Sequence, residues 1–227
     1  MRIIVYLLVV GLSGCAATGQ LSKNTETTDF SLDPAALDAG GIGFLTPISA
    51  TGQEADRVGV AIAFADQVAE ERADLHVVRL AEVLSAVNEA GLASGYKQMM
   101  TDYQATGLLE KDTLKQVGEA SGARYHGLLN LARFSQNSNK RFSIGGLRLM
   151  DTKEATLRIS WQVWDSQTGA IAWEGSDEIN YAYDTGRERP VNLAFVTGQA
   201  ATAMLAEFPA TGDAESSPVV ASLTSAR

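Results

Sequence analysis

The sequence predicts an α/β (α+β) fold, in which a mixed β-sheet that includes an antiparallel hairpin is layered with several helices. The clearest observation is TLRISWQVWDSQTGAIAWEG at 156–175, where apolar and polar side chains alternate and a turn at 165–169 leads into a return strand. The second observation is that short apolar runs in the first half alternate with segments of helical periodicity. Strands separated by helices, followed by a hairpin, indicate helices packed on a mixed sheet.

The elements follow from changes in period along the chain. A short apolar run at 42–45, ended by Pro47, predicts a buried strand, and the stripe of Val58, Ile62, Ala65 and Ala69 predicts a helix after it. The later elements, in order, are a strand at 75–80, a short helix ending at Gly91, helices at 95–107 and 111–122, a strand at 123–134, and a last helix at 193–208.

The helix at 95–107 carries Tyr96, Met99, Met100 and Tyr103 on one face. Such a stripe can line a ligand groove, but a helix that packs on a sheet needs the same stripe. We favour packing in the core.

Composition and charge exclude several classes of function. The 227 residues carry a formal charge of −9 with 45% hydrophobic side chains, and the isoelectric point is about 4.7. An acidic chain without a Lys/Arg cluster repels polyanions, so nucleic acid is not expected as a partner. One cysteine excludes an internal disulfide, and His76 and His126 have no metal-ligand spacing, so no metal or cofactor is predicted.

The single cysteine, Cys15, follows an apolar run of about ten residues, which is too short to span a bilayer. Leu12-Ser13-Gly14-Cys15 resembles the lipobox of bacterial lipoproteins. The resemblance implies that residues 1–14 are removed, that Cys15 is acylated, and that Ala16 directs the protein to the outer membrane. The alternative is an ordinary signal peptide cut near Ala16-Ala17, with Cys15 unmodified and a free product.

Composition divides the rest of the chain. Residues 15–40 are rich in Thr, Ser, Asn and Asp and predict a flexible tether after the lipidated cysteine. Residues 41–209 contain all of the apolar periodicity and predict a single periplasmic domain. Residues 210–227 are small and polar and predict a disordered tail.

Two turn motifs carry a resemblance over roughly 41–209. A helix that ends in Gly122-Ala123-Arg124-Tyr125, and a later strand that ends in DSQTG before a Trp-containing strand, are similar to envelope proteins of the CsgG and TolB N-terminal type, which include LpoB-like lipoproteins. The motifs position turns and carry no catalytic group. The segment 134–155 is interpreted as a charged loop, which disfavours a CsgG-like secretion-channel subunit.

No catalytic constellation is expected, so the protein is not predicted to be an enzyme. His76 and His126 each lie in a predicted strand and are interpreted as structural, and Asp177 and Glu178 point to opposite faces of one strand. Two surface features remain as a candidate interaction surface. Trp164 lies on the face opposite Trp161, where helices covering both faces would bury it, and Arg187 with Arg189 stand in a polar loop, where a solvated loop explains them equally well.

We expect an outer-membrane lipoprotein with its domain facing the periplasm, held to the membrane by acyl chains on Cys15. It acts as a protein-binding assembly or regulatory subunit of the cell envelope. Peptidoglycan or small-ligand binding is the alternative, and self-association into a homo-oligomer is left open.

Overall fold

The fold is built on a mixed sheet, as the computed structural model describes it for residues 20–49, 56–144, 147–184 and 192–210. The strands are β1 (Gln20–Asp29), β2 (Ile42–Phe44), β3 (Ile48–Ser49), β4 (Val77–Val78), β5 (Tyr125–Ile144), β6 (Leu147–Asp165) and β7 (Ile171–Asp184). The helices are α1 (Pro34–Gly40), α2 (Arg57–Glu71), α3 (Leu80–Glu89), α4 (Ala93–Thr106), α5 (Lys111–Ser121) and α6 (Leu193–Leu205).

The strand order is β1-β7-β6-β5-β2-β4, and β3 also pairs with β5. β5, β6, β7 and β1 pair in antiparallel fashion, whereas β2, β3 and β4 join in parallel. The predicted hairpin is therefore the β6–β7 pair within a mixed sheet, and the α/β fold class is confirmed.

Helices cover the sheet from both faces, because its strands present apolar side chains on both. Trp161, Val163 and Leu129 face a core formed with α1, α2 and α6. Leu128 and Trp164, their strand neighbours, face a second core formed with α3, α4 and α5. The methionine and tyrosine stripe of α4 belongs to this second core, as the packing interpretation expects.

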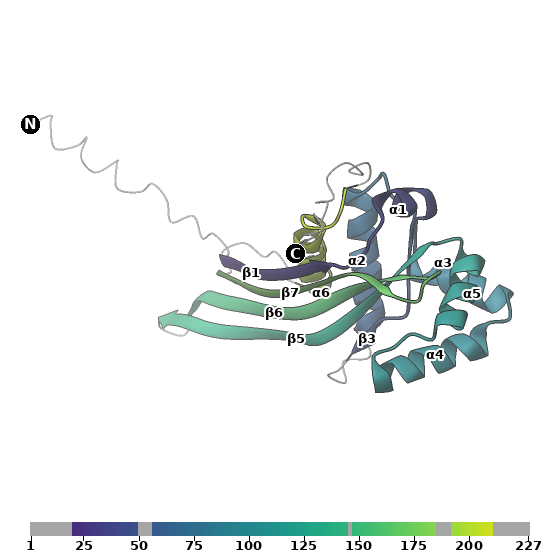
Figure 1. The fold of residues 1–227 in the computed structure, drawn as a ribbon. Helices are drawn as coiled ribbons and strands as arrows, with labels where there is room; N and C mark the ends of the chain where they lie inside the picture. The colour runs from purple at the N-terminus through teal and green to yellow at the C-terminus, as the bar shows by residue number, and fades with distance from the viewer. Residues whose placement is uncertain (1–19, 50–55, 145–146, 185–191, 211–227) are drawn as a thin grey trace, which may run out of the picture.

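The antiparallel strands form a long arm that extends away from the helices α3–α5 (Figure 1). Residues 134–155 are not the charged loop that the sequence pattern suggests. β5 and β6 stay paired from Phe134↔Leu157 to Ile144↔Leu147, with register shifts at Lys140/Phe142 and Phe142/Ser143. A bulge between Leu131 and Arg133 shifts the register, so a single alternating pattern does not run through the strand.

The prediction of a flexible tether is also wrong for residues 20–40, the part of 15–40 that the structure describes. β1 pairs along its whole length with β7, and α1 follows it, so the folded domain includes residues 20–40 and does not begin at residue 41. The strand QLSKNTETTD lacks an apolar alternation because it lies at the sheet edge, where the backbone supplies the pairing. Asp33 and Pro34 begin α1 as N-cap and first-turn proline, a signal present in the sequence.

No helix among the described residues is long and apolar enough to cross a membrane. The predicted tail at 210–227 lies outside the described residues except for Ala210, as do the signal peptide at 1–14 and Cys15.

Candidate functional site: a polar cleft at the end of α5

A cleft of about 670 Å³ opens where the ends of α1 and α5 meet the start of β5 and the β6–β7 turn. The elements that line it meet at the end of the strands opposite the tip of the arm, as the ribbon in Figure 1 shows. Its lining consists of Gly40, Lys115, Gly118, Glu119, Gly122, Ala123, Arg124, Ser166 and Gln167.

Glycines let the walls of the cleft approach one another. At Gly118, an added Cβ would lie 2.5 Å from Ser166 Oγ, so only a glycine lets α5 pack against the β6–β7 turn. Gly122 ends α5 with φ of 73°, a left-handed conformation that glycine adopts without strain.

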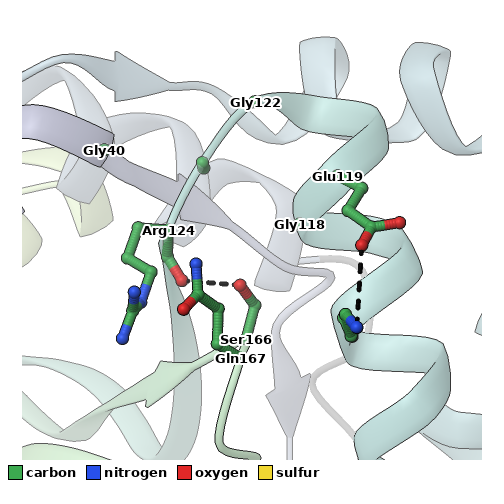
Figure 2. A pocket seen from close by; sticks show the side chains of 9 residues that line it. Gly40, Gly118, Glu119, Gly122, Arg124, Ser166 and Gln167 are labelled. Carbon is green, nitrogen blue, oxygen red and sulfur yellow. Dashed lines mark hydrogen bonds and ion pairs between the residues drawn. The ribbon is translucent and has the colours of Figure 1, made fainter.

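Arg124 and Asp165 hold the two turn motifs together. Arg124 Nε and Nη2 donate to the two carboxylate oxygens of Asp165 at 2.9 and 2.7 Å. The Ser166 hydroxyl donates to the Arg124 carbonyl at 2.8 Å, an interaction visible in Figure 2, and the Arg124 amide donates to the Gly40 carbonyl at 2.8 Å. A bidentate pair fixes orientation as well as distance, so the start of β5 is locked to the end of β6.

The electrostatics of this pair follow from its partial burial. Burial alone would raise the pKa of Asp165, but the hydrogen bonds from Arg124 and from the Gln167 and Thr168 amides outweigh it and hold the pKa below its ordinary value. The Asp165 carboxylate raises the pKa of Arg124. Both groups are therefore charged at neutral pH.

The mouth of the cleft is polar and carries both signs of charge. Lys115 and Glu119 stand on α5 with Lys115 Nζ 4.0 Å from Glu119 Oε1, and their side chains are 55% and 67% exposed. Glu119 projects from α5 across from Ser166 and Gln167 in Figure 2. Exposed ion pairs of this kind are weak and exchange partners readily. The arrangement can therefore accept a polar segment of another molecule through hydrogen bonds and charge pairing.

The two histidines differ in their surroundings, and only His126 is buried as a structural residue would be. His126 is fully buried on β5, and its Nε2 lies 3.2 Å from Ser121 Oγ. Burial lowers the pKa of His126 from 6.5 to about 4. A substrate cannot reach this ring in the structure, and His76 lies exposed before β4.

Asp177 and Glu178 lie on opposite faces of β7, as the alternation predicts. Asp177 is 1% exposed and accepts a hydrogen bond from Thr25 Oγ1 at 3.1 Å, whereas Glu178 faces solvent beside Arg158. No cluster of three or more histidine, cysteine, aspartate or glutamate side chains that could hold a metal occurs in the described ranges.

Trp164 is not available as an interaction surface. Its side chain is 3% exposed and packs edge-on against Tyr103 of α4 at a ring distance of 6.3 Å. Its Nε1 donates to Gln162 Oε1 at 3.3 Å. The prediction is wrong because α4 covers this face of the sheet. Cys15, Arg187 and Arg189 lie outside the described residues.

Both turn motifs can be identified in the sequence, but the cleft that they form cannot. The signal is present as Gly122-Ala123-Arg124-Tyr125 and DSQTG. Their meeting depends on the pairing Tyr125↔Asp165, which no local pattern specifies.

Comparisons with known proteins give distant structural likenesses. The fold is similar to a dodecamer of a PelC point variant from Paraburkholderia phytofirmans, with 12% identity, a TM-score of 0.44, and coverage of 85% of this chain and 99% of that chain. A second PelC dodecamer from the same organism matches with 10% identity, a TM-score of 0.43 and the same coverage. Lipoprotein GNA1162 from Neisseria meningitidis matches with 13% identity, a TM-score of 0.39, and coverage of 73% and 97%.

No family model and no curated protein matches the chain. At identities of 10–13% and TM-scores of 0.39–0.44, the likenesses carry no argument about activity, partners or assembly.

Proposed function

We propose that the protein is an outer-membrane lipoprotein, anchored by acyl chains on Cys15, whose periplasm-facing domain binds another envelope protein and has no catalytic role. The observation that carries the proposal is the sequence Leu12-Ser13-Gly14-Cys15, which ends five residues before Gln20, the first residue of β1. Several acyl chains on one residue hold a protein stably at a membrane.

The polar cleft is the binding site in this proposal. Its lining includes Lys115 and Glu119, which carry opposite charges, and the side chains of Ser166 and Gln167, which suits a charged loop of a partner protein. Arg124 and Asp165 keep its floor rigid, so the partner meets a preformed surface.

The anchor is tested by replacing Cys15 with Ala in the full chain. The wild type is expected in the membrane fraction with the mass of an acylated terminus. The Cys15→Ala protein is expected to be unprocessed or released, without lipid. A Cys15→Ala protein that is processed normally and remains on the membrane would remove the basis of the localisation.

The binding role is tested by affinity purification of the lipidated protein in gentle detergent. A stoichiometric envelope protein is expected with the wild type, and Lys115→Glu is expected to reduce its recovery because the charge at the mouth of the cleft is reversed. Glu89→Lys, at the exposed end of α3 outside the cleft, is the matched control. Absence of any stoichiometric partner would contradict the proposal.

A small polar ligand is the second candidate, because a cleft of about 670 Å³ is within the size range of ligand pockets. Peptidoglycan contains polar sugars and charged peptides that suit such a lining. Retention of the lipidated protein on isolated peptidoglycan, reduced by Lys115→Glu and not by Glu89→Lys, would favour this candidate over a protein partner.

A further inference from the structure

Three side chains form an apolar patch at the end of the sheet where the chain enters it. Leu21 on β1 lies opposite Tyr181 on β7, and the Tyr181 ring packs edge-on against Phe195 of α6 with ring centres 5.3 Å apart. Leu21 is 40% exposed and Phe195 is 41% exposed. We call Leu21, Tyr181 and Phe195 the entry patch.

The entry patch lies next to the proposed lipid anchor. Only residues 16–19 separate Cys15 from the first residue of β1, Gln20. Even a fully extended chain spans at most roughly 18 Å from Cys15 to Gln20. The start of β1 therefore cannot move farther from the acylated residue than about half the thickness of a bilayer.

We propose that the entry patch rests on the lipid surface and orients the domain on the membrane. This inference depends on acylation of Cys15 in the proposed function. Apolar side chains held within this distance of the bilayer gain free energy by entering the boundary between headgroups and acyl chains. Burial of the patch in lipid also removes the exposed apolar area from water.

The length of the arm determines how the sheet lies on the membrane. Gln20 is level with Asn137 in the sheet, through the register Gln20↔Ala182, Ala182↔Glu154 and Glu154↔Asn137. β5 continues beyond this level to Ile144, a further roughly 20 Å along the strand. An arm standing upright would place its tip in the bilayer, so the arm lies along the surface with its α6-bearing face toward lipid.

This orientation places the cleft away from the membrane. Lys23, on the same face of β1 as Leu21, donates from Nζ to the Gln199 carbonyl of α6 at 3.3 Å, which identifies the lipid-facing side. The cleft is lined by α5, which packs on the face of the sheet opposite α6. A partner in the periplasm can therefore reach it.

The proposed contact between the entry patch and the lipid is apolar rather than electrostatic. The chain carries a formal charge of −9, so anionic lipids repel the protein as a whole. Lys23 is the cation of β1, and it is engaged with α6. We therefore expect the orientation on zwitterionic phosphatidylethanolamine–phosphatidylcholine vesicles to be unaffected by salt.

The test uses the absence of any other cysteine. Because Cys15 is acylated in the mature protein, a new cysteine accepts a nitroxide label without background. The variants are Phe195→Cys at the entry patch and Leu108→Cys as the matched control. Leu108 is 65% exposed and lies between α4 and α5. Figure 1 shows these two helices at the end of the molecule opposite the start of β1. Each lipidated protein is reconstituted into these vesicles, and label collisions with oxygen and with a water-soluble nickel complex are measured.

The expected result is a ratio of nickel to oxygen collisions roughly threefold lower at position 195 than at position 108, since oxygen concentrates in lipid. Equal ratios on acylated, vesicle-bound protein would overturn the inference while leaving the anchor intact. A label at 195 shielded from both reagents would mean that a protein surface covers the patch, and would also overturn it. Lack of acylation by mass spectrometry would instead overturn the proposed function.

Discussion

Arg124 and Asp165 show how two turns that lie 41 residues apart become one structural unit. Each turn motif is readable in the sequence, but their bidentate ion pair depends on strand pairing. Trp164 likewise depends on a contact that the sequence pattern does not predict. Alternation correctly places it opposite Trp161, but whether a helix covers that face is a tertiary property.

Burial of His126 makes the stability of the fold depend on pH. The pKa of its imidazole falls from 6.5 to about 4 in the fold because burial disfavours the charged ring. Between these values the unfolded chain binds a proton that the folded chain does not, so stability falls as pH decreases through this window. Above pH 6.5 the His126 imidazole is neutral in both states and adds no pH dependence to the free energy of unfolding.

We predict that His126→Gln reduces the loss of unfolding free energy between pH 7 and pH 5 by about 2 kcal/mol. The measurement is urea unfolding of the Cys15→Ala protein at both pH values. His76→Gln, which changes an exposed histidine, is the matched control. An unchanged slope in His126→Gln would show that the buried ring does not control acid stability.

The apolar periodicity predicted where helices occur, but it did not predict which face of a helix packs against the sheet. The stripe that begins with Val58 and Ile62 indicated a helix, and α2 is present, but these two side chains are 47% and 54% exposed. The helix is apolar on most of its surface, so the face with Val60, Phe64 and Val68 could be chosen only once α6 and the sheet were in place.

The sequence pattern does not reveal a strand that joins the sheet through backbone hydrogen bonds rather than through apolar side chains. β1 is polar because it lies at an edge, and it pairs with β7 over ten residues. The bulge at Leu131/Arg133 brings Phe134 to the same core as Leu129, which breaks the alternation expected for β5. Register changes of this kind have no reliable local signal.

The contact between α5 and the β6–β7 turn yields a prediction about glycine. Gly118→Ala places a Cβ 2.5 Å from Ser166 Oγ, so we expect a loss of about 2 kcal/mol in unfolding free energy. Gly95→Ala on α4 is the matched control: its Cβ would lie 3.6 Å from Thr113 Cγ2, an ordinary contact, and helix propensity predicts a gain of up to about 1 kcal/mol. Urea unfolding of both variants measures the difference. Equal stabilities would contradict the tight packing at Gly118.

For the whole molecule, the position of β1 changes the relation between domain and membrane. A coil over residues 15–40 would let the domain range on the order of 25 to 30 Å from the lipid. Because β1 begins at Gln20, only residues 16–19 lie between the proposed anchor at Cys15 and the sheet, so the proposed function requires the sheet to stay near the surface. The same strand covers β7, where Thr25 donates to the buried carboxylate of Asp177. In the proposed function, the strand that completes this edge of the sheet therefore lies five residues after the anchor.

Lengthening that segment should separate anchoring from orientation. We predict that a glycine–serine insert of about 20 residues between Ala17 and Thr18 leaves the protein acylated and membrane-bound, because the anchor is unchanged and the insert adds roughly 25 Å of mean reach. Its urea unfolding should match that of the parent, since β1 still pairs with β7.

With a nitroxide at Phe195→Cys, the ratio of nickel to oxygen collisions should rise toward the value at Leu108→Cys, because three apolar side chains without a short anchor bind lipid only weakly. A ratio that stays low despite the insert would mean that the entry patch holds the domain on lipid by its own affinity. A ratio that rises together with a loss of unfolding free energy would instead mean that the insert disrupts β1. Only a rise at unchanged stability supports orientation by the short chain between Cys15 and Gln20.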